Sequence, residues 1–125
     1  MIFHGVNVVL PANIDEALTD GDIVNLDRWG FNLVRLGVVW EHIETKQGEY
    51  DTAYLGKVVE VVNKLAAKGI YTLINVHQDF ASSKTCGQGI PAFYAAEVLS
   101  QEKSCVSPRL DHLMSALIEQ ADVCK

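Results

Sequence analysis

The chain has 125 residues, of which 49% are hydrophobic and 21% charged, and this composition excludes a disordered or fibrous protein. Its formal net charge is −6, and its 10 Lys and Arg residues form no basic cluster, which excludes the electrostatic surface that nucleic acids or anionic membranes require. No apolar run approaches the roughly 20 residues that span a bilayer, and the N-terminal segment shows no signal-peptide pattern.

Apolar runs rich in β-branched residues predict three strands that are buried on both faces of a sheet. These strands cover residues 2–10, 31–39 and 70–77. Helices are predicted near residues 20–29, 51–68, 91–99 and 109–123. The three strands alternate with the first two helices, as in successive βαβ units, so we expect a parallel sheet.

Local signals mark the ends of the first two predicted helices. Asp20 is a candidate N-cap and Gly30 a stop signal for the first helix, and Asp51 and Gly69 have the same roles for the second. We expect the second helix to turn one apolar face toward the sheet. That face comprises Leu55, Val58, Val59, Val62, Leu65 and Ala66.

Three parallel strands leave two open sheet edges, and native proteins avoid open apolar edges. Two interpretations follow for a chain that ends its strand pattern near residue 77. The chain is either a small α/β domain that pairs with itself or with a partner, or the opening portion of a larger fold such as an eight-stranded barrel of about 250 residues.

Polar and aromatic side chains gather at the carboxyl ends of the predicted strands, where α/β folds place their ligand-binding groups. The residues concerned are Asn7, Arg35, Trp40, Glu41, Asn75, His77, Gln78 and Asp79. We expect them to orient a polar ligand. Trp40 is either a platform on which a sugar ring stacks or a residue that fills the rim of the core.

Arg35 is the sharpest single feature, because it places a permanent charge inside an apolar strand. A buried charge without a partner is very costly. We therefore expect Arg35 to meet a carboxylate or a ligand, and its planar guanidinium suits a carboxylate held through two hydrogen bonds. The alternative is an Arg that points to the surface from an edge strand.

His77 and Asp79 are two residues apart, so they project to the same side if the strand continues through both. Side by side they can share hydrogen bonds to adjacent sugar hydroxyls or form part of an acid–base pair. The alternative is a histidine satisfied within the fold and an aspartate that caps a loop. The spacing of the other histidines predicts no metal site.

Cys86, Cys105 and Cys124 form no pair with metal-binding spacing, and two of them could instead close a disulfide, which would imply an oxidising compartment. The alternative is three free thiols. The Gly87–Gly89 stretch is not a phosphate loop, because no strand closely precedes it and no Lys follows it. Glu41, Glu44 and Glu49, which follow the second strand, are expected to have local capping and turn roles.

Four motifs span about Ile2 to Tyr94, namely "FHGVNVV", "WGFNLVRLGVVWEHIETKQGEYDTAYL", "GIYTLINVHQDFAS" and "CGQGIPAFY". Together they resemble the N-terminal part of the endoglycoceramidases and their relatives in glycoside hydrolase family 5. The resemblance implies an α/β fold in which this chain forms the first three βα units of a (β/α)8 TIM barrel, so that residues 1–125 are the N-terminal part of a glycoside hydrolase catalytic domain. It also implies a retaining mechanism that cleaves the bond between glycan and ceramide in glycosphingolipids.

The resemblance also implies roles for individual residues. His77 and Asp79 would bind the hydroxyls of the sugar beside the scissile bond, and Arg35 would support the nucleophilic carboxylate. Asn7, Trp40 and Gln78 are further candidates for substrate binding. No cofactor and no metal are expected.

The two catalytic glutamates of the family follow its fourth and seventh strands, and the Asn-Glu-Pro element of the acid/base residue is absent from this sequence. We therefore expect this chain alone to be inactive. The alternatives are a non-catalytic protein that binds carbohydrate or glycolipid, and an α/β module that self-associates through its open sheet edges.

The family setting implies a secreted or lysosomal location outside the cytosol. A disulfide between Cys86 and Cys105, around the loop after the third strand, is expected in that setting.

Overall fold

The computed structural model describes residues 1–101. Its main sheet has three parallel strands in the order β1–β2–β5, where β1 is Gly5–Val9, β2 is Leu33–Val39 and β5 is Tyr71–His77. All three lie within the ranges predicted from the sequence. The register places Asn7 opposite Arg35, and Arg35 opposite Leu73.

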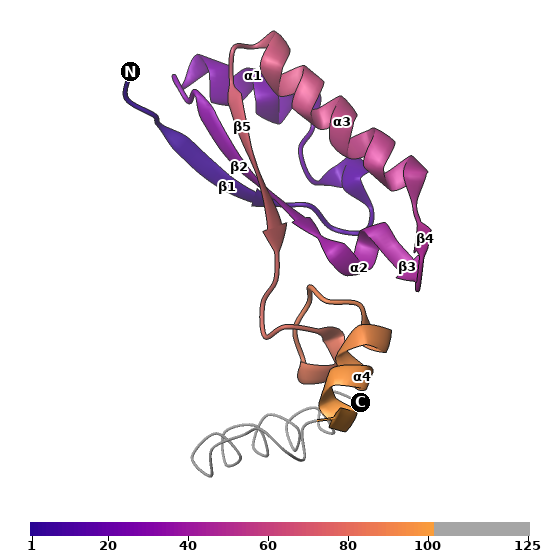
Figure 1. The fold of residues 1–125 in the computed structure, drawn as a ribbon. Helices are drawn as coiled ribbons and strands as arrows, with labels where there is room; N and C mark the ends of the chain where they lie inside the picture. The colour runs from indigo at the N-terminus through magenta and orange to yellow at the C-terminus, as the bar shows by residue number, and fades with distance from the viewer. Residues whose placement is uncertain (102–125) are drawn as a thin grey trace.

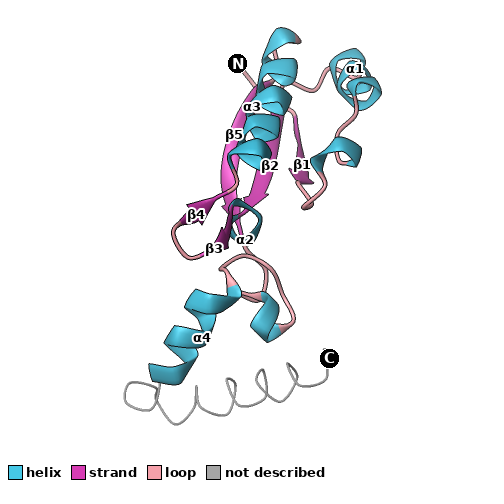
Figure 2. Cartoon of the chain, turned by 90° about the vertical axis from the view of Figure 1, so that its right-hand side faces the viewer, coloured by secondary structure: helices cyan, strands magenta, loops and turns pink. Residues whose placement is uncertain are grey.

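Two helices, α1 (Asp20–Arg28) and α3 (Thr52–Ala67), pack on one face of this sheet (Figures 1 and 2). Alternate residues of β1 and β2, such as Val8 and Leu36, enter the hydrophobic core beneath them. Because side chains alternate along a strand, the residues between them project from the opposite face of the sheet. The helices therefore leave that opposite face open.

The prediction that all three strands are buried on both faces is wrong for β1 and β5, in which every residue is exposed or only partly buried. Leu73, Ile74 and Val76 are all more than half exposed, and Val76 is 71% exposed. Within residues 1–101, β5 pairs only with β2, so its outer edge has no neighbouring strand. Its apolar sequence is therefore that of a central strand, while its surroundings are those of an edge.

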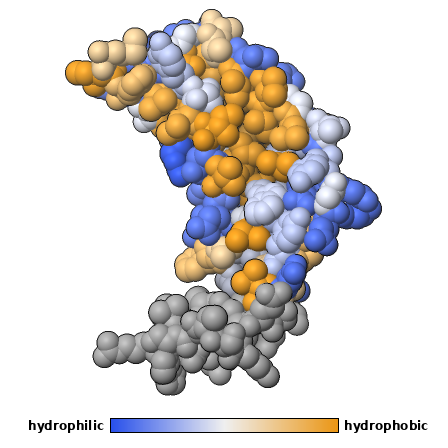
Figure 3. All heavy atoms as spheres, viewed as in Figure 1, coloured by the Kyte–Doolittle hydropathy of each residue, from blue (hydrophilic) through white to orange (hydrophobic). Residues whose placement is uncertain are grey.

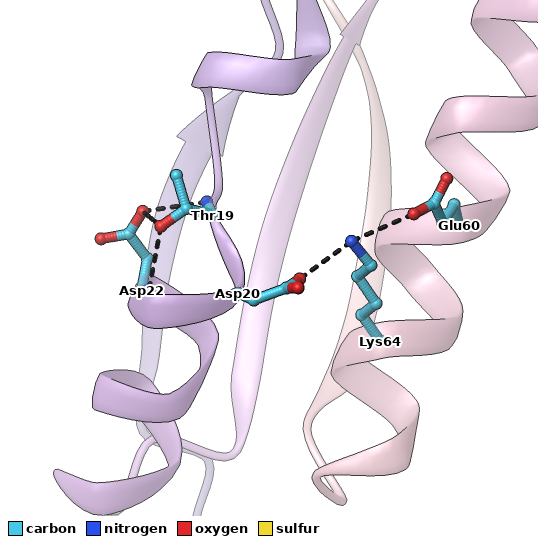
Figure 4. A network of polar contacts seen from close by, with 5 residues as sticks. All are labelled: Thr19, Asp20, Asp22, Glu60 and Lys64. Carbon is cyan, nitrogen blue, oxygen red and sulfur yellow. Dashed lines mark hydrogen bonds and ion pairs between the residues drawn. The ribbon is translucent and has the colours of Figure 1, made fainter.

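The first turn of α1 corrects one predicted cap. Thr19, rather than Asp20, is the N-cap, and its side chain accepts a hydrogen bond from the backbone N–H of Asp22. The Asp22 carboxylate accepts in return from the backbone and the hydroxyl of Thr19, which completes a capping box (Figure 4). Asp20 is left free to bind Lys64 at 2.8 Å, and the Lys64 ammonium also binds Glu60.

The ends of α1 and α3 otherwise follow the predicted signals. Asp51 caps α3 by accepting from the backbone N–H of Tyr54 at 2.8 Å. Gly30 and Gly69, which follow the two helices, both have left-handed backbone conformations, with φ of 80° and 70°. A residue with a Cβ is strained in that conformation, which explains the glycines at these helix ends.

The buried face of α3 differs from the predicted face by part of a turn. The residues buried against the sheet are Tyr54, Val58, Val61 and Leu65. Leu55 is 36% exposed and Val59 is 57% exposed, although both belong to the predicted face. Apolar residues therefore extend around more of α3 than the part that contacts the sheet. Among the described residues, only one side of this apolar surface is covered.

Smaller elements surround the carboxyl end of the sheet and were not individually predicted. They are the 3-10 turns η1 (Ile14–Glu16) and η2 (Ser83–Thr85), the short helix α2 (Trp40–Ile43), and the hairpin of β3 (Glu44–Lys46) and β4 (Glu49–Tyr50). Helix α4 (Ala92–Gln101) matches the helix predicted near 91–99 and lies beyond the strand ends, away from α1 and α3 (Figure 1). The helix predicted near 109–123 lies outside the described residues. No helix in the described part is long and apolar enough to cross a membrane.

Candidate functional site

The open face of the sheet carries a set of polar side chains, with Asn7 and Arg35 inside their strands and His77 at the carboxyl end of β5. Arg35 and Asn7 stand opposite each other on β2 and β1, and the Arg35 guanidinium donates to Oδ1 of Asn7 at 2.5 Å. Arg35 is only half-buried, and it makes no ion pair within residues 1–101. The expected carboxylate partner is thus replaced here by an amide, which satisfies one N–H without neutralising the charge.

His77 ends β5 and lies against Gly37 on the neighbouring strand. A Cβ added at Gly37 would stand 3.2 Å from the Cβ of His77 and 3.3 Å from its Cγ. Glycine at this position therefore makes room for the imidazole on the open face.

His77 also lies close to Asn75, which stands two residues earlier on β5. The amide nitrogen of Asn75 lies 3.3 Å from Nδ1 of His77, and this contact is a hydrogen bond in the tautomer that leaves Nδ1 without a proton. Asn75 and His77 thus form a polar pair at the carboxyl end of β5.

Asp79 and Gln78 are not placed by a continuous strand, because β5 ends at His77. Asp79 instead forms an isolated antiparallel bridge with Gln88, with two backbone hydrogen bonds of 2.8 Å. His77 and Asp79 were expected to project to the same side if the strand continued through both, and β5 does not continue to Asp79. Both Gln78 and Asp79 are exposed.

The glycines of the Gly87–Gly89 stretch allow this bridge to form. A Cβ at Gly87 would stand 1.9 Å from the carbonyl oxygen of Asp79, and one at Gly89 would stand 2.5 Å from the Cβ of Gln78. Real Cβ atoms do not approach so closely. The two glycines therefore bring the backbone of residues 87–90 against the segment that carries Gln78 and Asp79.

Trp40 follows β2 directly and is held on two sides. Its indole Nε1–H donates to Oε2 of Glu44 at 2.7 Å, and its ring lies 5.4 Å from the ring of Tyr94. Trp40 is half-buried, so part of its indole is accessible. Trp40 therefore packs at the rim through its contacts with Glu44 and Tyr94, as one alternative expected, and it also leaves part of its surface accessible, as the other requires.

Glu44 is a buried carboxylate of this region that the sequence did not single out. It is 1% exposed, and its carboxylate accepts hydrogen bonds from Trp40, from the backbone N–H of Gly48 and from the Tyr94 hydroxyl. The Gly48 N–H contributes most to lowering the pKa of Glu44 below its usual value, and burial opposes this effect. The hydrogen bond that the Tyr94 hydroxyl donates to Glu44 raises the pKa of that hydroxyl.

Glu41 makes a second tie to the distant loop. Its backbone N–H donates to the carbonyl of Gly89 at 2.9 Å, and its carboxylate accepts from the Gly89 N–H at 3.3 Å. The expected local role is confirmed for Glu44 by its bonds with Trp40 and Gly48, but both Glu41 and Glu44 also make long-range contacts that were not expected. Their partners Gly89 and Tyr94 lie 48 and 50 residues away, a distance at which no spacing rule in the sequence would reveal them.

Cys86, at the end of η2, is disulfide-bonded. Cys105 and Cys124 lie outside the described residues, so the pairing of Cys86 with Cys105 stays a prediction. Within residues 1–101, no group of three or more His, Cys, Asp or Glu side chains is arranged to hold a metal ion.

The side chains of this face are chemically varied. They include a guanidinium, an imidazole and amide groups on one face of the sheet, with a half-buried aromatic ring after β2. Polar groups of this kind fix the orientation of a ligand, while an aromatic face packs against its apolar side.

Known proteins resemble this chain in sequence and in fold. A family model described as Cellulase (glycosyl hydrolase family 5) matches residues 4–106. Endoglycoceramidase I of Rhodococcus hoagii is 41% identical over 97 residues, which cover 73% of this chain and 19% of that protein. An endoglycoceramidase of Cyanea nozakii is 36% identical over 98 residues, or 71% of this chain and 20% of that protein.

A solved structure of endo-glycoceramidase II from Rhodococcus sp., in complex with a five-membered iminocyclitol, has a similar fold. It matches with a TM-score of 0.65 and 29% identity, over 74% of this chain and 23% of that one. The matched part of the chain thus spans about a fifth of the length of the curated relatives.

Proposed function

The chain belongs to glycosyl hydrolase family 5, and from this premise we propose that it is the N-terminal part of an endoglycoceramidase-type hydrolase, which cleaves the glycan–ceramide bond of glycosphingolipids. In this proposal β1, β2 and β5 are the first strands of a (β/α)8 barrel, and the open face of the sheet is the barrel interior. The parallel order of the strands and the helices on one face support it.

The observation that carries the proposal is the position of His77. His77 stands at the carboxyl end of β5, where its side chain lies against Gly37 and 3.3 Å from the amide nitrogen of Asn75. We assign it, with Asp79, to the hydroxyls of the sugar next to the scissile bond. Asn7, Trp40 and Gln78 are proposed as further substrate contacts, and Arg35 as the support of a nucleophilic carboxylate.

A retaining glycosidase needs two carboxyl groups about 5–5.5 Å apart across the sugar. In the proposed scheme both belong to barrel segments that these 125 residues do not contain. The residues of this chain therefore bind and orient the sugar, and we expect the chain alone to release no oligosaccharide from a glycolipid. Enzyme-dependent release by the purified chain would contradict this division of roles.

Sugar binding is testable on the chain itself with lactose as the probe. We expect amide resonances around residues 75–79 to shift in a saturable way, and His77→Ala to weaken the affinity about tenfold, the effect of losing one good hydrogen bond. His4→Ala is the matched control, because His4 is exposed and precedes the opposite end of the sheet. Equal affinities of the two variants, or no lactose response in the parent chain, would refute the assignment of His77.

A second candidate function, self-association, rests on the exposed apolar surface. Figure 3 shows apolar side chains gathered where β5 and α3 lie side by side. The exposed large apolar residues of these two elements include Leu73, Ile74, Val76 and Val59. A surface of this kind marks an interaction site. Sedimentation equilibrium, together with the lactose titration, distinguishes the two candidate functions. A monomer that binds lactose favours a role in a hydrolase, and a stable homo-oligomer that does not bind lactose favours self-association.

We also propose a location outside the cytosol, secreted or lysosomal. The disulfide of Cys86 supports it, because such bonds persist mainly in oxidising compartments. Mass spectrometry of the natural protein under non-reducing conditions tests this, and three free thiols would contradict it.

A further inference from the structure

The carboxylate of Glu44 joins three segments that meet at the carboxyl end of the sheet. Oε2 accepts from Trp40 in α2 at 2.7 Å, and Oε1 accepts from the Gly48 N–H in the β3–β4 turn at 2.7 Å and from the Tyr94 hydroxyl in α4 at 2.9 Å. Because Glu44 is 1% exposed, these protein groups replace the water that a carboxylate normally binds.

All three partners of Glu44 present a hydrogen to it. A carboxylate suits such a site because it only accepts hydrogen bonds and has room for about four of them. An ionised acceptor also makes shorter and stronger bonds than a neutral one. The pKa of Glu44 is lowered despite its burial, which means that the three donors outweigh the cost of removing the charge from water.

We propose that Glu44 is a positioning residue, which sets the orientation of the Trp40 indole at the sugar site and couples it to the loop after β5. The importance of this for sugar binding rests on the proposed function. Trp40 is half-buried, and Glu44 fixes the edge of its ring through Nε1. Tyr94 lies in the first turn of α4, directly after the loop that Glu41 holds through Gly89, so Glu44 restrains the end of that loop.

Glu44→Gln is the decisive variant because it keeps the shape of the side chain and changes only its hydrogen bonding. The remaining oxygen of the amide can accept from both Gly48 and Tyr94. The amide nitrogen then faces the indole N–H of Trp40, and two donors repel each other. The expected result is therefore a selective loss of the Trp40 hydrogen bond within a folded protein.

The measurement is the pair of indole N–H resonances in a nitrogen–proton correlation spectrum of the 125-residue chain. The chain has two tryptophans, and Trp29 is 67% exposed and serves as an internal reference. We expect Glu44→Gln to move the Trp40 resonance upfield and speed its exchange with solvent, while the Trp29 resonance stays in place. Tyr94→Phe is the matched control: it removes one hydroxyl from the same carboxylate and leaves the Trp40 bond intact.

An unchanged Trp40 resonance in a folded Glu44→Gln variant would overturn the proposal, because Trp40 would then be placed by its ring contact with Tyr94 alone. If Glu44→Gln does not fold, an acid titration of the parent chain gives the same information. Protonation of Glu44, below its usual pKa of 4.5, must then move the Trp40 resonance, and Tyr94→Phe must raise the midpoint of that change. A Trp40 resonance that ignores this titration would equally overturn it.

The indole measurement contains no ligand, so its outcome does not depend on whether the chain binds sugar. A lactose titration supplies the second readout: we expect Glu44→Gln to weaken lactose binding severalfold, and Lys46→Ala, at an exposed position two residues away, to leave it unchanged. A parent chain that shows the Glu44-dependent indole shift but no lactose response would refute the proposed function and leave the positioning of Trp40 by Glu44 intact.

Discussion

The imidazole of His77 lies against the backbone of Gly37, in the space that a side chain on β2 would otherwise fill. A Cβ at Gly37 would meet His77 and the Cγ2 of Val9, each at 3.2 Å. The His77 side chain can occupy this position at the proposed sugar site because Gly37 on the neighbouring strand β2 has no side chain.

Gly37→Ala is expected to push His77 from this position. The contacts are tighter than most real Cβ contacts, so we expect a loss of about 1–2 kcal/mol in the free energy of unfolding and weaker lactose binding. Gly56→Ala is the control within α3, where nothing lies within 4 Å of the added Cβ. There we expect a gain of about 0.5–1 kcal/mol, because alanine favours a helix interior over glycine. Urea unfolding measures both, and a Gly37→Ala variant as stable as the parent, with unchanged lactose affinity, would contradict the packing argument.

Asn7→Asp is expected to stabilise the chain. Arg35 donates to Asn7 but has no acidic partner within the described residues, and both side chains are at least partly exposed. A carboxylate at that position gains an ion pair worth up to about 1 kcal/mol, and less at high salt. Asn7→Ala is the comparison and should lose about 0.5–1.5 kcal/mol. If Asn7→Asp lowers the free energy of unfolding at low salt, Arg35 already has another anionic partner.

Two leucines on α3 test which face of the helix is buried. Leu65 is fully buried in the core, whereas Leu55 is 36% exposed. Leu65→Ala should therefore cost about 2–5 kcal/mol, and Leu55→Ala clearly less, because its side chain already contacts solvent. Thermal or urea unfolding gives both values. Similar losses at the two positions would indicate that the exposed side of α3 is covered in solution, as self-association would require.

Acid should weaken the fold through Asp22 and Glu44. The pKa of Asp22 is lowered, first by the side-chain hydrogen bond from Thr19, and the pKa of Glu44 is lowered, first by the Gly48 N–H. A carboxyl group with a lower pKa in the folded state stabilises the fold at pH values above its unfolded pKa. That stabilisation is lost as pH falls through the folded value. We therefore expect stability to fall below about pH 4.5, measured by urea unfolding between pH 7 and pH 3.

Thr19→Ala isolates the share of Asp22 in this acid response. We expect a loss of about 1 kcal/mol at pH 7 from the missing N-cap, and a smaller further decrease on acidification than in the parent chain. Thr45→Ala, at an exposed position in β3, is the control and should stay within about 0.5 kcal/mol of the parent at each pH. Parallel pH profiles for the Thr19→Ala variant and the parent would show that the capping box does not lower the Asp22 pKa.

Sequence patterns were sufficient for the main elements because their causes are local. Apolar runs defined β1, β2 and β5, and Asp51, Gly30 and Gly69 marked helix ends through hydrogen bonds and backbone conformations that involve only near neighbours. The choice of Asp20 over Thr19 failed within one residue, since both are good caps and only the reciprocal bond with Asp22 decides between them.

The sequence by itself also determined which residue types stand at the strand ends, because a polar residue that follows an apolar strand is visible without any partner. Only the tertiary structure decided what those residues contact. Arg35 meets Asn7 across two strands, His77 fits over Gly37, and Glu44 binds Tyr94 from 50 residues away. Such contacts depend on strand register and on the path of the loop after β5, and neither is encoded in the spacing of neighbouring residues.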